Sequence, residues 1–277
     1  MNETQTPQTP PHAMPDEEVT LPAESFQATN MDLNPDLDEE DDDEQEPEIE
    51  QEQPQNQPQH PFDLWTVPFD EALLQLSSSH PREVPLLSMA QQSKLITFLD
   101  DRILQVQRQF IKSQSEAEVS YPLLQLLQDV RSIVDLIWFL VDLNGPLFGQ
   151  EEYLIRLLGD LEDWIAYYEF PLLDANNPDV LTTYEALFQL FQAFDTRISF
   201  LIDGYQLKGS AHGLSGTEIV RLGPIANRLR MEIVEKMERS RTHLLQKRND
   251  GHASSVYYMN VLEIEVGRLL EGIMERV

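Results

Sequence analysis

Apolar residues recur at steps of three or four from residue 86 to residue 277, and this periodicity limits the folds open to the chain. In one stretch, Leu95, Leu99, Ile103, Val106 and Phe110 fall on a single face of a helix. No run of alternating apolar and polar residues lies between turn signals, as a half-buried strand would require. The sequence therefore predicts an all-α protein, a multi-helix bundle.

Capping residues, prolines and glycines divide this region into about six main helices. Ser88 and Gln91 have the spacing of a capping box, and Asn177 precedes a first-turn proline. Gly223-Pro224 is expected to interrupt a helix after one or two turns. The main helices are expected at about 88–115, 121–143, 151–169, 177–203, 225–247 and 254–275. Residues 86–277 are interpreted as one helical domain, whose only plausible internal boundary is the glycine- and serine-rich loop 208–215.

The first 61 residues have a different composition. Residues 1–60 carry 18 carboxylates and no Lys or Arg, and they account for much of the formal net charge of −30. With few apolar residues to bury, such a segment cannot offset the entropy of ordering its backbone. Residues 1–61 are therefore predicted to be a long, disordered, acidic arm. Thr6 and Thr9 each precede a proline, as in sites of proline-directed kinases, but the sequence does not show whether they are phosphorylated.

Between the acidic arm and the helical domain, residues 62–85 contain several aromatic side chains, among them Phe62, Trp65 and Phe69. A short helix is expected at about 70–76. Two interpretations remain open. The segment lies on the folded domain and contributes its aromatic rings to packing, or it forms an acidic-aromatic docking motif that binds a basic partner surface.

The sequence shows no recognisable reaction centre. It contains no cysteine, no phosphate-binding or dinucleotide-binding glycine motif, and no histidine pair at metal-binding spacing. We therefore expect no enzymatic activity, no cofactor and no metal. No apolar run reaches the roughly 20 residues of a membrane span, and the N-terminus lacks the features of a secretory or mitochondrial leader. We expect no membrane association and an intracellular location.

The most uneven charge distribution lies between residues 221 and 248, where eight basic residues face three acidic ones. Three interpretations are open: a solvated helix face, a docking face for an acidic partner or for the chain's own arm, and a site for nucleic-acid backbone. Nucleic acid is the least favoured of these, and the absence of aromatic residues from the stripe weakens single-strand binding in particular. The candidate partner-binding residues here are Arg228, Arg230, Arg239, Arg241, Lys247 and Arg248.

Two segments resemble a fungal family of small helical accessory subunits of the transcription factor TFIIH, the Tfb series. One is LLSMAQQSKLITFLDDRILQVQRQFIK at 86–112, in which Phe98-Leu99-Asp100 is followed by the Gln105-Val106-Gln107-Arg108 cadence. The other is DVRSIVDLIWFL at 129–140, with the core Asp135-Leu136-Ile137-Trp138. The resemblance extends over about residues 85–275 and includes a glutamate-rich helical C-terminus.

That resemblance implies a nuclear, non-catalytic regulatory subunit of a transcription initiation and DNA repair complex. Its expected partners are TFIIH core subunits and the XPB-type helicase, whose release from TFIIH such subunits are associated with. It also suggests that the acidic run, followed by Phe62 and Trp65, docks on the pleckstrin-like domain of the TFIIH core. The alternative is a helical scaffold or adaptor subunit of another nuclear complex.

Overall fold

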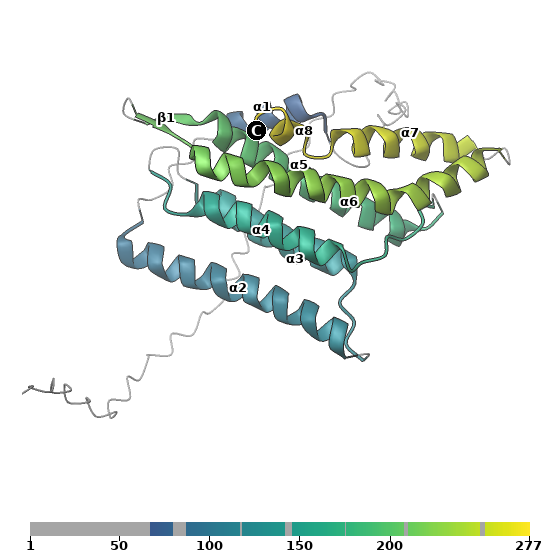
Figure 1. Ribbon diagram of the computed structural model, residues 1–277, viewed down its shortest axis with the longest axis horizontal. Helices are drawn as coiled ribbons and strands as arrows, with labels where there is room; N and C mark the ends of the chain where they lie inside the picture. Colours follow the sequence, from purple (N-terminus) through teal and green to yellow (C-terminus); the bar gives the residue numbers. More distant parts are fainter. Residues whose placement is uncertain are drawn as a thin grey trace, which may run out of the picture. The chain divides into compact units, whose positions relative to one another are not determined.

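The computed structural model describes residues 67–79, 87–116, 118–141, 146–174, 176–207, 210–249 and 253–277. All of these belong to one compact unit of the chain. The described part contains eight helices and one two-stranded ribbon (Figure 1). The elements are α1 (Phe69–Ser79), α2 (Met89–Ser115), α3 (Leu123–Phe139), α4 (Gln150–Ile165), α5 (Pro178–Asp203), β1 (Tyr205–Leu207), β2 (Ser210–His212), α6 (Gly216–Asn249), α7 (Ala253–Arg268) and α8 (Glu271–Met274).

The all-α prediction is confirmed, and local signals explain several helix boundaries. The Ser88 backbone N–H donates to the Gln91 side chain, and the Gln91 N–H donates to Ser88 Oγ, so the capping box is formed. A second box joins Ser215 to Glu218 at the start of α6. Asn177 Oδ1 accepts from the N–H groups of Asp179 and Val180 at the start of α5. These contacts satisfy amide donors that have no partner within the helix.

Helix α5 contacts α1, α3, α4 and α8, and α6 contacts α4, α7 and α8. Phe188, Phe191 and Phe194 of α5 are almost fully buried, as are Leu158 of α4 and Leu229 of α6. Helix α2 packs on α3 and lies on the opposite side of the bundle from α7 and α8 (Figure 1). The core therefore lies between α3, α4, α5 and α6, and α2 covers one flank.

The predicted interruption of a helix at Gly223-Pro224 is wrong, because α6 runs without a break from Gly216 to Asn249. Pro224 has no N–H to donate to the carbonyl four residues earlier, at Val220. The residues around that missing bond face solvent, since Val220 is 74% exposed and Pro224 is also exposed. Water can bind the released carbonyl, so the helix continues.

The end of the chain also differs from the single helix expected at 254–275. Helix α7 ends at Arg268, and Leu270 adopts a left-handed conformation with φ of 54° before α8 begins. Leu270 is buried, so its packing stabilises a backbone conformation that is unfavourable for a residue with a side chain. Within the expected loop 208–215, residues 210–212 form the strand β2. It pairs with β1 in an antiparallel ribbon that places Tyr205 opposite His212.

No helix within the described ranges is long and apolar enough to cross a membrane. Across these same ranges, no group of three or more His, Cys, Asp or Glu side chains is arranged to bind a metal ion.

Candidate functional site

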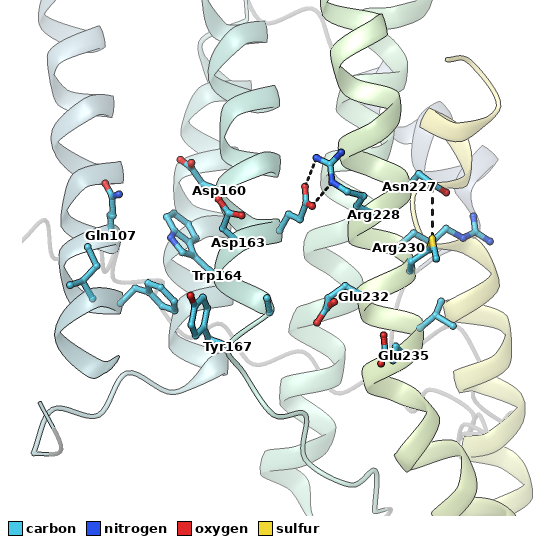
Figure 2. A pocket seen from close by; sticks show the side chains of 16 residues that line it. Gln107, Asp160, Asp163, Trp164, Tyr167, Asn227, Arg228, Arg230, Glu232 and Glu235 are labelled. Carbon is cyan, nitrogen blue, oxygen red and sulfur yellow. Dashed lines mark hydrogen bonds and ion pairs between the residues drawn. The ribbon is translucent and has the colours of Figure 1, made fainter. Parts of the chain in front are cut away.

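A groove across α2, α4 and α6 has a cavity volume of about 1130 Å³. Figure 2 shows the three helices contributing side chains to one face. Helix α2 contributes Gln107, Phe110 and Ile111. The other lining residues are Asp160, Glu162, Asp163, Trp164, Ala166 and Tyr167 from α4 and its C-terminal turn, and Asn227, Arg228, Arg230, Met231, Glu232, Val234 and Glu235 from α6.

Helical periodicity explains why these residues share one surface. On α4, the positions 160, 163, 164 and 167 are separated by the three- and four-residue steps that align side chains along one face. On α6, positions 227, 231 and 234 have the same relation, as do positions 107, 110 and 111 on α2. The groove is therefore lined by one face of each of three helices and by the turn that follows α4.

Aromatic side chains form the floor of the groove. Phe110 and Trp164 are buried, and their ring centroids are 6.3 Å apart. Tyr167 lies edge-on to Phe110 with a centroid distance of 5.5 Å, yet it is 67% exposed. Such pairs favour tilted and edge-on geometry because of the ring quadrupole. The floor therefore packs on the core through Phe110 and Trp164, whereas Tyr167 exposes its ring to solvent.

The rim of the groove carries more acid than base. Five carboxylates and two guanidinium groups line it. Arg228 is bound to Glu162 by two hydrogen bonds, of 2.6 and 3.0 Å. Arg230 donates to the backbone carbonyls of Leu269 and Gly267, at 3.1 and 2.9 Å. Burial raises the pKa of Asp160, which indicates that carboxylates here are partly removed from water.

The basic residues of α6 mostly bind carboxylates and carbonyls of neighbouring segments. Arg221 binds Glu152 at 2.8 Å, Arg228 binds Glu162, and Arg239 binds Glu169. Lys236 donates to the Ala166 carbonyl at 3.0 Å, and Lys247 pairs with Asp174 at 3.1 Å. In each case the α6 residue lies about 70 positions beyond its partner, so α6 runs parallel to α4 and the segment that follows it. We call these contacts the α4–α6 ladder.

The remaining candidates of the basic stripe are placed differently. Arg241 pairs with Glu263 of α7 and with Glu238 of its own helix. Arg230, as described above, binds carbonyls at the end of α7. Arg248 is exposed near the end of α6. Of the six predicted residues, some contact α4 or the segment that follows it, some contact α7, and Arg248 faces solvent. They therefore do not form one shared binding surface.

The aromatic candidates divide into two groups. Phe62 and Trp65 lie outside the described residues. Phe69 is the first residue of α1 and lies against Gly272 and beneath the Arg276 guanidinium, which is 5.6 Å from the ring centroid. Just before it, the Val67 carbonyl accepts hydrogen bonds from Gln192 and Arg268. Phe69 is thus part of the packing between α1, α5 and α8.

Sequence reasoning missed the groove. Of the residues that line the groove, Ile111, Tyr167 and Met231 are exposed although they are large and apolar. These three side chains depart from the polar pattern expected on the outer face of a helix. This departure from the pattern is the only sign of the groove in the sequence. The sequence alone does not show that the three residues come from helices that lie side by side.

The fold and the groove define an all-α protein with a surface suited to binding another protein. The family model named TFB6, described as subunit 11 of the general transcription factor TFIIH, matches residues 121–260. The chain belongs to this family, and the resemblance seen in the sequence is confirmed. The matched region includes the Asp135-Leu136-Ile137-Trp138 core, whereas the segment 86–112 lies outside it.

A similar protein from Saccharomyces cerevisiae (strain ATCC 204508 / S288c) is named the general transcription and DNA repair factor IIH subunit TFB6. The two are 31% identical over 205 residues, which cover 60% of this chain and 58% of that protein. The chain thus spans less than two thirds of the length of this curated relative. No solved structure significantly matches the chain.

Proposed function

We propose that the protein is a nuclear, non-catalytic regulatory subunit of TFIIH that acts in transcription initiation and DNA repair by binding other proteins. The observation that carries this proposal is membership of the family described as subunit 11 of TFIIH. The name of the yeast relative supports both transcription and repair. The groove across α2, α4 and α6 supports a role in protein binding, because exposed apolar patches of this kind mark interaction sites.

The specific function proposed is to bind the XPB-type translocase and promote its dissociation from TFIIH. A protein that binds the free translocase more tightly than the TFIIH-bound form shifts the equilibrium toward release by mass action. No energy source is needed for this step. The chain would therefore act in proportion to its concentration, and its effect would saturate when the free translocase is fully bound.

Within the aromatic segment, Phe62 and Trp65 are proposed to dock on a TFIIH core subunit, with the acidic arm guiding the encounter. Phe69 is assigned a different role, since its ring packs against Gly272 and contributes to the fold. This division separates a binding function from a structural one within eight residues of sequence.

The basic residues of α6 are proposed to align α6 with its neighbours. Exposed ion pairs such as Arg221 with Glu152 each add little stability, but together they favour one register of α6 against α4. We propose that nucleic acid is not a partner of this stripe, because most of its cations are already paired with a carboxylate that competes with phosphate for them. Binding of duplex DNA by the full chain, lost on reversal of Arg239 and Arg241, would contradict this assignment.

The experiment that tests the proposed function uses TFIIH from the same organism, immobilised through a core subunit with its translocase bound. The full chain is added at increasing concentration, and the translocase released and retained is quantified by mass spectrometry. We expect release to rise with concentration and then to saturate. The Phe62→Ala/Trp65→Ala variant should need a higher concentration for the same release.

Two outcomes would contradict the proposal. If the chain binds immobilised TFIIH but the translocase stays in place at saturation, the subunit assignment stands and the release function is wrong. If the chain tagged and purified from its own cells brings down another nuclear complex without TFIIH subunits, the scaffold alternative replaces both.

A further inference from the structure

We propose that the groove across α2, α4 and α6 is a docking site for a basic amphipathic helix of a partner protein. This inference does not depend on the TFIIH assignment, because it follows from the shape, apolar surface and charge of the groove. It names the chemistry of the bound segment: apolar side chains along one stripe, flanked by Lys and Arg.

The first argument is the concentration of exposed apolar surface. Four large apolar side chains that line the groove are substantially exposed: Ile111 by 53%, Tyr167 by 67%, Met231 by 64% and Val234 by 39%. They come from α2, the turn after α4, and α6, and they line the same groove as the buried rings of Phe110 and Trp164. Single exposed apolar residues are ordinary on a protein surface, but a gathered set around an aromatic floor is typical of a binding groove.

The second argument is geometric. The lining residues of α6 extend from Asn227 to Glu235, which at 1.5 Å per residue is about 12 Å along the helix axis. A groove formed between helices accommodates a helix that places anchors at i, i+3 or i+4, and i+7. The length of the groove matches two to three turns of such a helix. Met231 supplies a flexible side chain that can adapt to the shape of the anchors.

The third argument is charge. Asp163 and Glu235 are exposed; Asp163 lies on α4, between the side chains of α2 and those of α6, and Glu235 lies on α6 (Figure 2). Arg228 is already bound to Glu162, and Arg230 points toward the carbonyls at the end of α7. The charge that α4 and α6 present to a bound segment is therefore negative. Lys or Arg residues flanking an apolar stripe would meet complementary charge and guide the encounter.

The same charge argues against two other occupants. The chain's own arm carries 18 carboxylates and no Lys or Arg in residues 1–60, so the exposed acids of the groove would repel it. A second copy of the chain would bring the same acids face to face, and the whole chain carries a formal net charge of −30. A basic segment of another protein is the occupant that the charge favours.

The test uses the full chain and a designed probe. The probe is an 18-residue fluorescein-labelled helical peptide with a leucine stripe at i, i+3, i+4 and i+7 flanked by Lys and Arg. Its counterparts replace every basic residue by Glu, or every stripe leucine by Ser. Binding is followed by fluorescence anisotropy at 0.15 M salt. We expect the basic amphipathic peptide to bind at least tenfold more tightly than either counterpart.

Variants locate the bound peptide on the groove. Asp163→Lys/Glu235→Lys reverses the charge of the two exposed acids of the groove, and Asp101→Lys/Glu118→Lys is the matched reversal of exposed acids elsewhere. Met231→Glu places a charge on the apolar surface, and Val220→Glu is its control on the same helix, at a residue 74% exposed outside the groove. We expect the groove variants to weaken binding at least tenfold and the controls to change it less than twofold. Thermal unfolding of each variant verifies that the fold is retained.

The outcomes distinguish the groove from the acidic arm. Because the arm is a polyanion, it could attract a basic peptide without any groove, and then neither pair of reversals would change binding. That result, or equal binding of the leucine and serine peptides, would overturn the proposal. A photo-reactive residue in the peptide stripe should cross-link to α2, α4 or α6. A dimer in sedimentation that dissociates on Met231→Glu would assign the groove to a second copy instead and would also overturn it.

Discussion

The ring of Phe69 lies against Gly272, in the space that a Cβ atom at position 272 would occupy. Ser199 Oγ would also be 2.8 Å from such a Cβ. Gly272 is the second residue of the short helix α8, and Phe69 begins α1, more than 200 residues earlier in the chain. Because Gly272 has no side chain, the Phe69 ring can pack against α8, and this contact connects the first described helix to the last.

We expect Gly272→Ala to destabilise the protein by about 1–3 kcal/mol, because an added methyl in a filled site displaces its neighbours. The loss should be concentrated in α1, whose amide hydrogens should exchange faster. Urea unfolding measures the free energy, and hydrogen exchange with mass spectrometry measures the local effect.

Gly267→Ala is the matched control, because a Cβ at this α7 position would meet nothing within 4 Å. Alanine favours helix over glycine by up to about 1 kcal/mol, so this variant should be as stable as the wild type or more stable. The double variant Phe69→Ala/Gly272→Ala should lose less unfolding free energy than the sum of the losses in the two single variants. Full additivity would show that the contact between the two residues has no energetic role.

Asp195 gives the protein a dependence of stability on pH. Its carboxylate oxygens accept hydrogen bonds from the backbone N–H groups of Gly272 and Ile273, at 3.0 and 2.8 Å. These bonds and Arg276 favour the charged form, whereas burial and the nearby Glu271 oppose it. Burial is the largest effect, and the pKa of Asp195 is raised to about 7.

A pKa raised in the folded state means that the folded protein binds this proton more tightly than the unfolded chain does. The contribution of Asp195 to stability is therefore fully present below pH 4 and is lost as pH rises toward 7. We expect Asp195→Asn to flatten the decrease in unfolding free energy between pH 5 and pH 7.5, measured in urea. An unchanged slope would mean that other groups, such as Glu151 and Glu271, whose pKa values burial also raises, carry the dependence.

Sequence patterns predicted most helices because their signals are local. Ser88 with Gln91, and Asn177 with its proline, mark helix starts through contacts that span only a few residues. The interruption at Pro224 was predicted wrongly because the cost of a missing hydrogen bond depends on whether the released carbonyl faces solvent. That property belongs to the tertiary structure, and the helix continues where the sequence suggested a break.

The candidate site could not be predicted in the same way. The basic stripe of α6 was visible, but the partners of Arg228 and Lys247, namely Glu162 and Asp174, lie about 70 residues earlier in the chain. Their pairing depends on the parallel alignment of α4 and α6, which periodicity does not specify. The groove likewise needs three helices in one arrangement, so its exposed apolar residues appear in the sequence only as scattered exceptions.

Asp135 is expected to be more important than its half-exposed position suggests. It accepts two hydrogen bonds from Arg131, at 2.9 and 3.0 Å, and pairs with Arg197 across the contact between α3 and α5. The Arg197 side chain is only 11% exposed, and burial lowers its pKa. Asp135→Ala would leave that guanidinium without its carboxylate, at a cost of about 1.5–3 kcal/mol.

The control is Asp203→Ala, since Asp203 has a similar exposure and a single ion pair with Arg276. Exposed pairs of this kind contribute about 0–1 kcal/mol. Equal losses for the two variants in urea unfolding would contradict a special role for the contact with Arg197.

Ser240 of α6 is the centre of a buried polar contact with Tyr184 of α5 and with the segment 171–174. Its hydroxyl accepts a hydrogen bond from the Leu173 backbone N–H at 3.1 Å and lies 2.7 Å from the Tyr184 hydroxyl, which donates to the Pro171 carbonyl at 2.9 Å. Ser240 is 1% exposed, so water cannot replace these bonds. Ser240→Ala should cost about 1–3 kcal/mol, because it leaves the Leu173 N–H buried without a partner.

The neighbouring Thr242 is exposed on the same helix, and Thr242→Ala should change the unfolding free energy by less than about 0.5 kcal/mol. Tyr184→Phe removes the second hydroxyl of the network. If the three polar groups act as a unit, Ser240→Ala/Tyr184→Phe should cost less than the sum of the two single losses. A loss below about 0.5 kcal/mol for Ser240→Ala would show that the segment 171–174 relaxes to satisfy its own backbone, and that the polar network does not hold it against α6.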